Sequence, residues 1–122
     1  MMNLGKFYIN GEWVTPISSN SMRIINPADE SEIGTIILAN KADVDLAVMA
    51  ANTAFLSYSR TSKQERLGML EALLALSKKK LPDLAKVISI EMGAPMTMSL
   101  ELQADAAIGH LEGYIYALKN QT

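Results

Sequence analysis

The sequence predicts an α+β chain in which short strands come first and helices follow. Residues 6–38 hold short runs of β-branched and aromatic residues separated by turn signals. Residues 41–120 carry apolar residues at spacings of three and four, which is the helical period. The repeated strand–helix alternation of a complete nucleotide-binding sheet is missing. With 122 residues, we expect a single partial domain that covers residues 1–122.

The predicted strands occupy the first third of the chain. Two short runs flank Asn10-Gly11, a pair that tolerates the positive φ angles of a type I′ turn, so we expect a β-hairpin there. Two further strands precede the first helix, and the earlier one stops at a proline, which pushes the residue before it out of helical space. The four predicted strands cover residues 6–9, 12–15, 22–25 and 34–38.

Capping residues mark the starts of the first two predicted helices. Asn40 can cap the first, with Asp43 in the first turn, where a negative charge suits the helix dipole. Ser62 and Glu65 form a capping-box pattern for the second. We expect these helices to end near residues 56 and 80. Their apolar lines are Val44, Ala47, Val48, Ala51, Ala54 and Phe55 in the first, and Leu67, Leu70, Leu74 and Leu81 in the second.

Two prolines and a glycine predict two more helices. Pro82 suits the first turn of a short third helix, and Gly93 is placed to end it in a left-handed conformation. Pro95 then opens a fourth helix of about 25 residues, roughly 37 Å long. A helix of that length with a broad apolar stripe needs more protein to cover it. We therefore expect the chain to be the unfinished part of a larger fold.

Composition excludes several classes of protein. Hydrophobic residues make up 49% of the chain, charged residues 20%, and the net charge is −2, so no basic surface for nucleic acid is expected. The sequence contains no run of about 18 consecutive apolar residues, so no membrane span is predicted. The chain has no cysteine, which excludes disulfides and thiolate sites within it. With no apolar N-terminal segment either, these features favour a cytoplasmic protein.

A search for catalytic motifs finds none. The seven glycines form neither a dinucleotide nor a P-loop fingerprint. His110 is the only histidine and lacks the further ligands that a metal site needs, which favours a structural role. Glu101 and Asp105 are one turn apart, so they either pair or belong to a solvated face. We therefore assign no catalytic, cofactor-binding or metal-binding residue.

Several segments, taken in order, nevertheless resemble the start of the aldehyde dehydrogenase superfamily. They cover nearly the whole chain, and their order and spacing are more specific than any one of them. The segments are residues 7–14 (FYINGEWV), 24–27 (IINP), 33–36 (IGTI), 42–47, 50–55, 66–67, 91–95 (EMGAP) and 108–111.

The resemblance implies part of a longer NAD(P)-dependent enzyme whose small-molecule substrate is an aldehyde, which it oxidises to a carboxylic acid. Its parent fold would be α/β with a Rossmann-type cofactor domain. In this family a cysteine thiolate attacks the aldehyde, an asparagine and a backbone amide hold the oxyanion, and a glutamate activates water. These groups and the cofactor loop lie beyond the part that this chain resembles. We expect an N-terminal segment that is inactive alone and binds neither NAD nor NADP.

The same resemblance suggests two incomplete sites. The long helix of such enzymes lines the substrate tunnel, and Leu102 and Ala106 fall on that face. Some members also hold a structural monovalent cation through a carboxylate at the position of Glu91 and a backbone carbonyl near Ile24. A third ligand would come from outside this chain.

Two other interpretations stay open. The chain could be a free-standing helical interaction module, since its last helix is apolar and rich in methionine, or a truncated non-catalytic paralogue. Apolar surface left bare by truncation predicts a homo-oligomer. Such association often exchanges an element between copies, and the long C-terminal helix is the element expected to take part. The sequence leaves open which aldehyde is used and whether NAD or NADP accepts the hydride.

Overall fold

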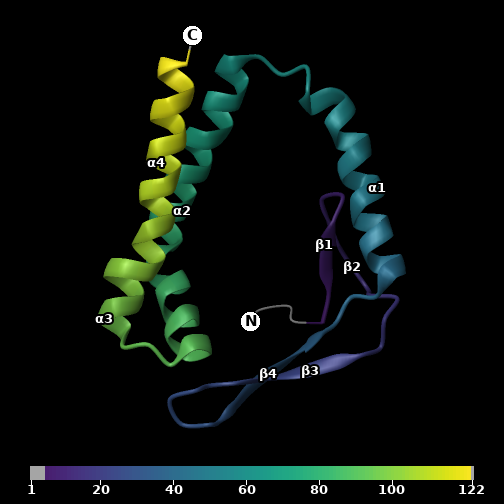
Figure 1. Ribbon diagram of the computed structural model, residues 1–122, viewed down its shortest axis with the longest axis vertical. Coiled ribbons are helices and arrows are strands. Elements are labelled where there is room, and N and C mark those ends of the chain that lie inside the picture. Colours follow the sequence, from purple (N-terminus) through teal and green to yellow (C-terminus); the bar gives the residue numbers. More distant parts are fainter. Residues whose placement is uncertain (1–4, 122) are drawn as a thin grey trace. The chain divides into compact units, whose positions relative to one another are not determined.

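The computed structural model describes residues 5–121, in which short strands precede helices as expected (Figure 1). The chain divides into two compact units. The first comprises Met1–Ile25 and Ser31–Arg60, and the second comprises Asn26–Glu30 and Thr61–Thr122. The elements are β1 (Phe7–Ile9), β2 (Glu12–Val14), β3 (Ser21–Ile25), β4 (Glu32–Ile37), α1 (Lys41–Tyr58), α2 (Lys63–Met92), α3 (Met96–Met98), the π-helix η1 (Ser99–Ala104) and α4 (Asp105–Asn120).

The first unit begins with the predicted hairpin of β1 and β2. The strands are antiparallel, and Phe7 lies opposite Val14. Asn10 and Gly11 have φ angles of 55° and 82°, the two positive values that a type I′ turn requires, so the predicted turn is confirmed. The rings of Tyr8 and Trp13 are in contact across the hairpin, with centroids 5.2 Å apart and planes tilted by 57°.

β3 and β4 form a separate two-stranded antiparallel sheet. Ile24 pairs with Gly34 and Ile25 with Glu32, so Ile33 is an extra residue that bulges from β4. Both strands start earlier than predicted, and β4 also stops one residue earlier, before Leu38. Ends of strands follow hydrogen bonding to the partner strand, which the residue pattern marks less clearly than the strand itself.

Helix α1 starts at the predicted cap. The Asn40 side chain accepts a hydrogen bond from the Asp43 amide (3.0 Å), and the Asp43 carboxylate accepts one from the Asn40 amide (3.1 Å). The helix ends at Tyr58, two residues later than predicted. Its predicted apolar line, however, is exposed within the described residues: Phe55 is 62% exposed and Val48 is 53% exposed.

Helix α2 corrects a prediction. Its Ser62–Glu65 capping box is present, but the helix continues to Met92, so the predicted break and the third helix at Pro82 are wrong. Proline removes one hydrogen bond within a helix and strains the preceding turn. Packing outweighs that cost here, because α2 meets the last helices on both sides of Pro82: Leu67 and Ala85 are both buried.

Gly93 ends α2 with a φ of 67°, the left-handed conformation that was predicted. A Cβ at this position would lie 3.0 Å from the Ala28 nitrogen, so glycine is also required by close approach. Pro95 then precedes α3. From Met96 to Asn120 the chain stays helical, as predicted, but one π-helical segment, η1, interrupts the α-helical geometry.

The core of the second unit lies between α2 and the last helices, which run side by side in opposite directions (Figure 1). Lys78 pairs with Glu112 at 2.7 Å, and Lys119 pairs with Glu71 at 2.8 Å, so two ion pairs on the surface join the antiparallel helices. Apolar spacing of three and four along α4 places its buried side chains on the α2 side. The buried apolar residues are Leu67, Ala85, Ala104, Ile108 and Ile115.

Candidate functional site

The two residues predicted to face a substrate tunnel lie on the last helical stretch. Leu102 is in η1 and is 66% exposed, and Ala106 follows one turn later in α4 and is also exposed. Neither side chain belongs to the core between α2 and α4. Both are therefore available on the surface of the second unit, four positions apart on one side of the helix.

The π-helical segment is the local feature that the sequence did not reveal. The amide of Asp105 donates to the carbonyl of Leu100, a bond that spans five residues instead of four. Ser99 and Ala104, also five apart, are both fully buried. In an α-helix two residues five apart point about 140° away from each other, so the π geometry is what lets both face α2.

Two polar atoms in this segment are buried without a hydrogen-bond partner in the described part of the chain, Ser99 Oγ and Gln103 Oε1. The amide nitrogen of Gln103 donates only a long contact, 3.8 Å, to the sulfur of Met92. Nearby, the hydroxyl of Ser89 donates to the Ala94 carbonyl at 2.7 Å, which ties the end of α2 to the loop that follows. Buried polar groups without hydrogen-bond partners are uncommon in folded proteins, because an unpaired buried group is unfavourable.

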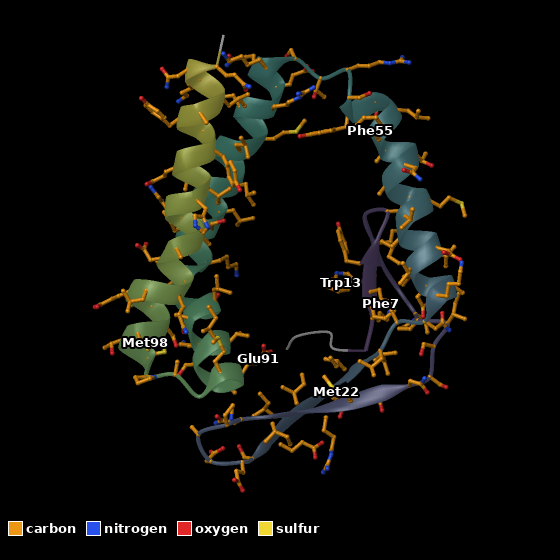
Figure 2. All side chains as sticks on the ribbon, viewed as in Figure 1. Phe7, Trp13, Met22, Phe55, Glu91 and Met98 are labelled. Atoms are coloured by element: carbon orange, nitrogen blue, oxygen red, sulfur yellow. The ribbon has the colours of Figure 1, made fainter. Side chains whose placement is uncertain are left out.

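The predicted cation ligands belong to different units of the chain. Ile24 lies in β3 of the first unit and is half-buried, and Glu91 lies in the last turn of α2 in the second unit with its side chain exposed (Figure 2). Within residues 5–121 no cluster of three or more histidine, cysteine, aspartate or glutamate side chains is placed to hold a metal ion. Each of the two residues can supply one oxygen ligand.

Asp43 is the one buried charged residue among those described, with 4% of its surface exposed. Its carboxylate accepts hydrogen bonds from the amides of Ile17 (2.7 Å), Ser18 (3.1 Å) and Asn40 (3.1 Å). Burial raises the pKa of Asp43, but these three amides stabilise the ionised form more strongly, and the net pKa is lowered. This arrangement binds the loop before β3 to the start of α1, so the residue has a structural role.

The remaining chemical candidates are dispersed. His110, Glu101 and Asp105 are all exposed on the last helical stretch of the second unit. In the first unit, pockets are lined by α1 and the β1–β2 hairpin. One of about 390 Å³ includes Glu12, Thr15 and Asp43, but the Asp43 carboxylate there is already engaged by backbone amides. The Ser62 hydroxyl donates to the Glu65 carboxylate at 2.8 Å, but these groups form the capping box at the start of α2, which gives them a structural role.

No helix in residues 5–121 combines the length and the apolar character needed to cross a bilayer.

The sequence of this chain is similar to those of known proteins. The model of the aldehyde dehydrogenase family matches residues 13–122. The chain is 46% identical over 111 residues to 3-succinoylsemialdehyde-pyridine dehydrogenase of a Pseudomonas species, which is 90% of this chain and 23% of that protein. The chain thus spans about a quarter of the length of the curated relatives it matches.

Solved structures also match this chain over about a quarter of their own length. An aldehyde dehydrogenase from Bartonella henselae superposes with a TM-score of 0.96 at 39% identity, over 100% of this chain and 26% of that one. Aldehyde dehydrogenase C from Pseudomonas syringae, solved with NAD+ and octanal, superposes with a TM-score of 0.94 at 34% identity, over 98% and 24%. The strands and the helical pair described above are thus the N-terminal portion of a known fold, and the chain belongs to the aldehyde dehydrogenase family.

Proposed function

We propose that these residues are the N-terminal segment of an NAD(P)-dependent enzyme that oxidises an aldehyde to a carboxylic acid. The observation that carries the proposal is the family match over residues 13–122. The segment supplies scaffold rather than chemistry: it has no cysteine to act as the attacking thiolate. Nor does it have the glycine-rich loop that would cradle a dinucleotide phosphate. The residues present therefore do not fit the cofactor, and NAD would be held by other parts of the enzyme.

Within that enzyme, we assign Leu102 and Ala106 to the wall of the substrate tunnel. Support comes from their exposure on one side of the last helical stretch, outside the core of the second unit. An apolar wall suits an aldehyde with a hydrocarbon chain, because each buried methylene contributes about 0.8 kcal/mol. The Pseudomonas syringae relative was solved with octanal and NAD+, which makes these two compounds the first probes.

The test compares two purified proteins, the 122-residue chain and the complete polypeptide that contains it. Each is mixed with octanal and NAD+, and reduced cofactor is followed by its absorbance. We expect turnover from the complete polypeptide and none from the 122-residue chain. Aldehyde oxidation by the short chain would refute the scaffold role, and a complete polypeptide that oxidises no aldehyde would refute the enzyme assignment.

A second proposal concerns a monovalent cation. The Glu91 carboxylate and the Ile24 carbonyl would each supply one ligand, with others from outside this segment. In the complete protein, potassium should then raise the unfolding temperature, because a bound ion stabilises only the folded state. Replacement Glu91→Gln should abolish the potassium dependence and leave the temperature in sodium-free choline buffer unchanged. An equal potassium effect in both proteins would exclude Glu91 as a ligand.

We also propose that the 122-residue chain self-associates, as a homo-oligomer that exchanges its last helix between copies. The support is the exposed apolar surface: Tyr114 and Tyr116 on α4 are 66% and 71% exposed. Sedimentation at tens of micromolar, a working range of order 10⁻⁵ M for such contacts, should show dimers or larger species. A monomer at that concentration would contradict the proposal.

We also propose a cytoplasmic location for the enzyme, which the absence of cysteine from these residues favours.

A further inference from the structure

Met92 is the last residue of α2, at the point where this helix gives way to the loop that leads to α3. It is 60% exposed, so small solutes have access to its side chain. The amide nitrogen of Gln103 in η1 donates to its sulfur at 3.8 Å. Met69, also on α2, is 51% exposed, but its sulfur has no donor among the described residues. Met92 thus combines exposure with an N–H group that already points at the sulfur.

The side-chain amide of Gln103 is held in place, yet its hydrogen bonding is incomplete. The residue is half-buried, and its carbonyl oxygen Oε1 is buried with no partner among the described residues. Its N–H contact with the sulfur of Met92 is long, and a thioether is a weak acceptor. A good donor is therefore fixed in front of a weak acceptor. A stronger acceptor at the position of the sulfur would complete this hydrogen bond.

Oxidation of the thioether supplies such an acceptor. The sulfur attacks one oxygen of hydrogen peroxide, an S–O bond forms, the O–O bond breaks and water leaves. The sulfur is oxidised to the sulfoxide as the peroxide is reduced. The new oxygen carries partial negative charge and lies one bond beyond the sulfur, on which the Gln103 N–H closes from 3.8 Å. It can therefore accept from Gln103 at the ordinary distance of about 2.9 Å.

We propose that Met92 is a site of reversible oxidation by peroxide, and that its sulfoxide fastens the end of α2 to η1 through Gln103. A sulfoxide disrupts an apolar core, because it places a polar group there without a partner. At Met92 the side chain is exposed and the donor is in position, so oxidation stabilises the junction instead. Methionine sulfoxide reductases return the sulfoxide to the thioether. This modification is independent of the aldehyde chemistry proposed above.

The test treats the complete polypeptide with hydrogen peroxide, and then with a methionine sulfoxide reductase and its thiol reductant. Tandem mass spectrometry distinguishes oxygen added to Met92 from oxygen added to Met96 or Met98, which are also exposed. Hydrogen exchange of residues 93–100 is measured at each stage. The matched control is Met92→Leu, which removes this sulfur and leaves the other methionines open to oxidation.

We expect one added oxygen on Met92. Exchange in residues 93–100 should become about fivefold slower, the factor typical of one additional hydrogen bond. Treatment with the reductase should restore the original rate, and the Met92→Leu protein should show no slowing. A folded wild-type protein that gains no oxygen at Met92 would overturn the inference. Exchange that is unchanged or faster in the oxidised wild-type protein would overturn it as well.

A second variant, Gln103→Leu, tests the donor. Leucine has a similar size, lacks the N–H group and also removes the unpaired Oε1, so the variant should fold. Peroxide should still oxidise Met92, but exchange in residues 93–100 should then become faster, because the sulfoxide has no donor. Equal slowing in the wild type and in Gln103→Leu would show that Gln103 does not hold the sulfoxide. If this variant does not fold, the comparison of wild type with Met92→Leu decides alone.

Discussion

The two units of the chain are stabilised in different ways. The second unit has an apolar core, in which Leu67 and Ala85 of α2 pack against the last helices. The first unit has no buried apolar side chain among its described residues, and its one buried side chain is the Asp43 carboxylate. Helix α1 leaves Val44, Met49 and Phe55 at least half exposed.

This difference indicates which unit has an apolar core made from its own residues. Burial of apolar surface is the main favourable term in folding, at about 25 cal/mol per Å². The second unit obtains that term from its own residues. The first unit depends on hairpin hydrogen bonds and on the amides that bind Asp43, each of which contributes less. Helix α1 therefore keeps an apolar face that the described residues of its own unit do not bury.

The largest effect is expected from a cavity in the second unit. Ile108→Ala removes three carbons from a side chain that is 7% exposed, and we expect a loss of about 2–5 kcal/mol in the free energy of unfolding. Phe55→Ala, a larger truncation at a position that is 62% exposed, should change stability by no more than about 0.5 kcal/mol. Urea unfolding followed by circular dichroism measures both. Equal losses would show that α1 is buried in solution, for example by another copy.

Gly93→Ala should be the next most damaging change. The left-handed conformation costs an alanine about 1–2 kcal/mol, and its Cβ would press on the Ala28 nitrogen, which donates to the Asn26 side chain. Gly93→Asn tests the two causes separately, because asparagine tolerates the left-handed backbone but carries the same Cβ. If both variants lose equal stability, close approach dominates. If neither loses any, the tight contact with Ala28 is absent in solution.

The caps and turns were predictable because each depends on residues close together in sequence. Asn40, Ser62 and Gly93 act on backbone groups within three or four positions, and each does what was predicted. The Asn10-Gly11 turn is equally local. Predictions of this kind need no knowledge of what packs on the helix or strand.

Predictions that depended on packing were less successful. Pro82 is an ordinary signal for a helix start, yet the helix continues through it, and α2 has a buried residue on each side of it, Leu67 and Ala85. The π turn also depends on packing, because its geometry lets both Ser99 and Ala104 be buried on the side of α2. The tunnel assignment of Leu102 and Ala106 came from family resemblance and stays a prediction, since most of the tunnel would lie outside this segment.

Acid should destabilise the first unit more than the second. The pKa of Asp43 is lowered in the folded state, so its contribution is present at neutral pH and is lost as the pH falls below about 3.9, the value in an unfolded chain. Trp13, the only tryptophan, lies in this unit and reports its unfolding by fluorescence. Asp43→Asn should lower stability at neutral pH and remove that part of the acid response. Asp45→Asn, at an exposed aspartate two positions away, is the matched control and should preserve both. Identical acid curves for wild type and Asp43→Asn would contradict this role.

The smallest effect concerns the end of the second unit. Lys63, at the start of α2, donates to the carbonyls of Lys119 (3.2 Å) and Gln121 (2.6 Å), groups that the end of α4 leaves without helical partners. A cation at a helix C-terminus contributes about 0.3–1 kcal/mol, so Lys63→Met should cost that amount and speed hydrogen exchange only in the last turn of α4. Lys79→Met, on the exposed side of α2, should change neither. Because the second unit has its own core, fraying at this end should stop at Ile115, which is buried. Faster exchange that extends past Ile115 into η1 would show that the helical pair is less independent than its packing indicates.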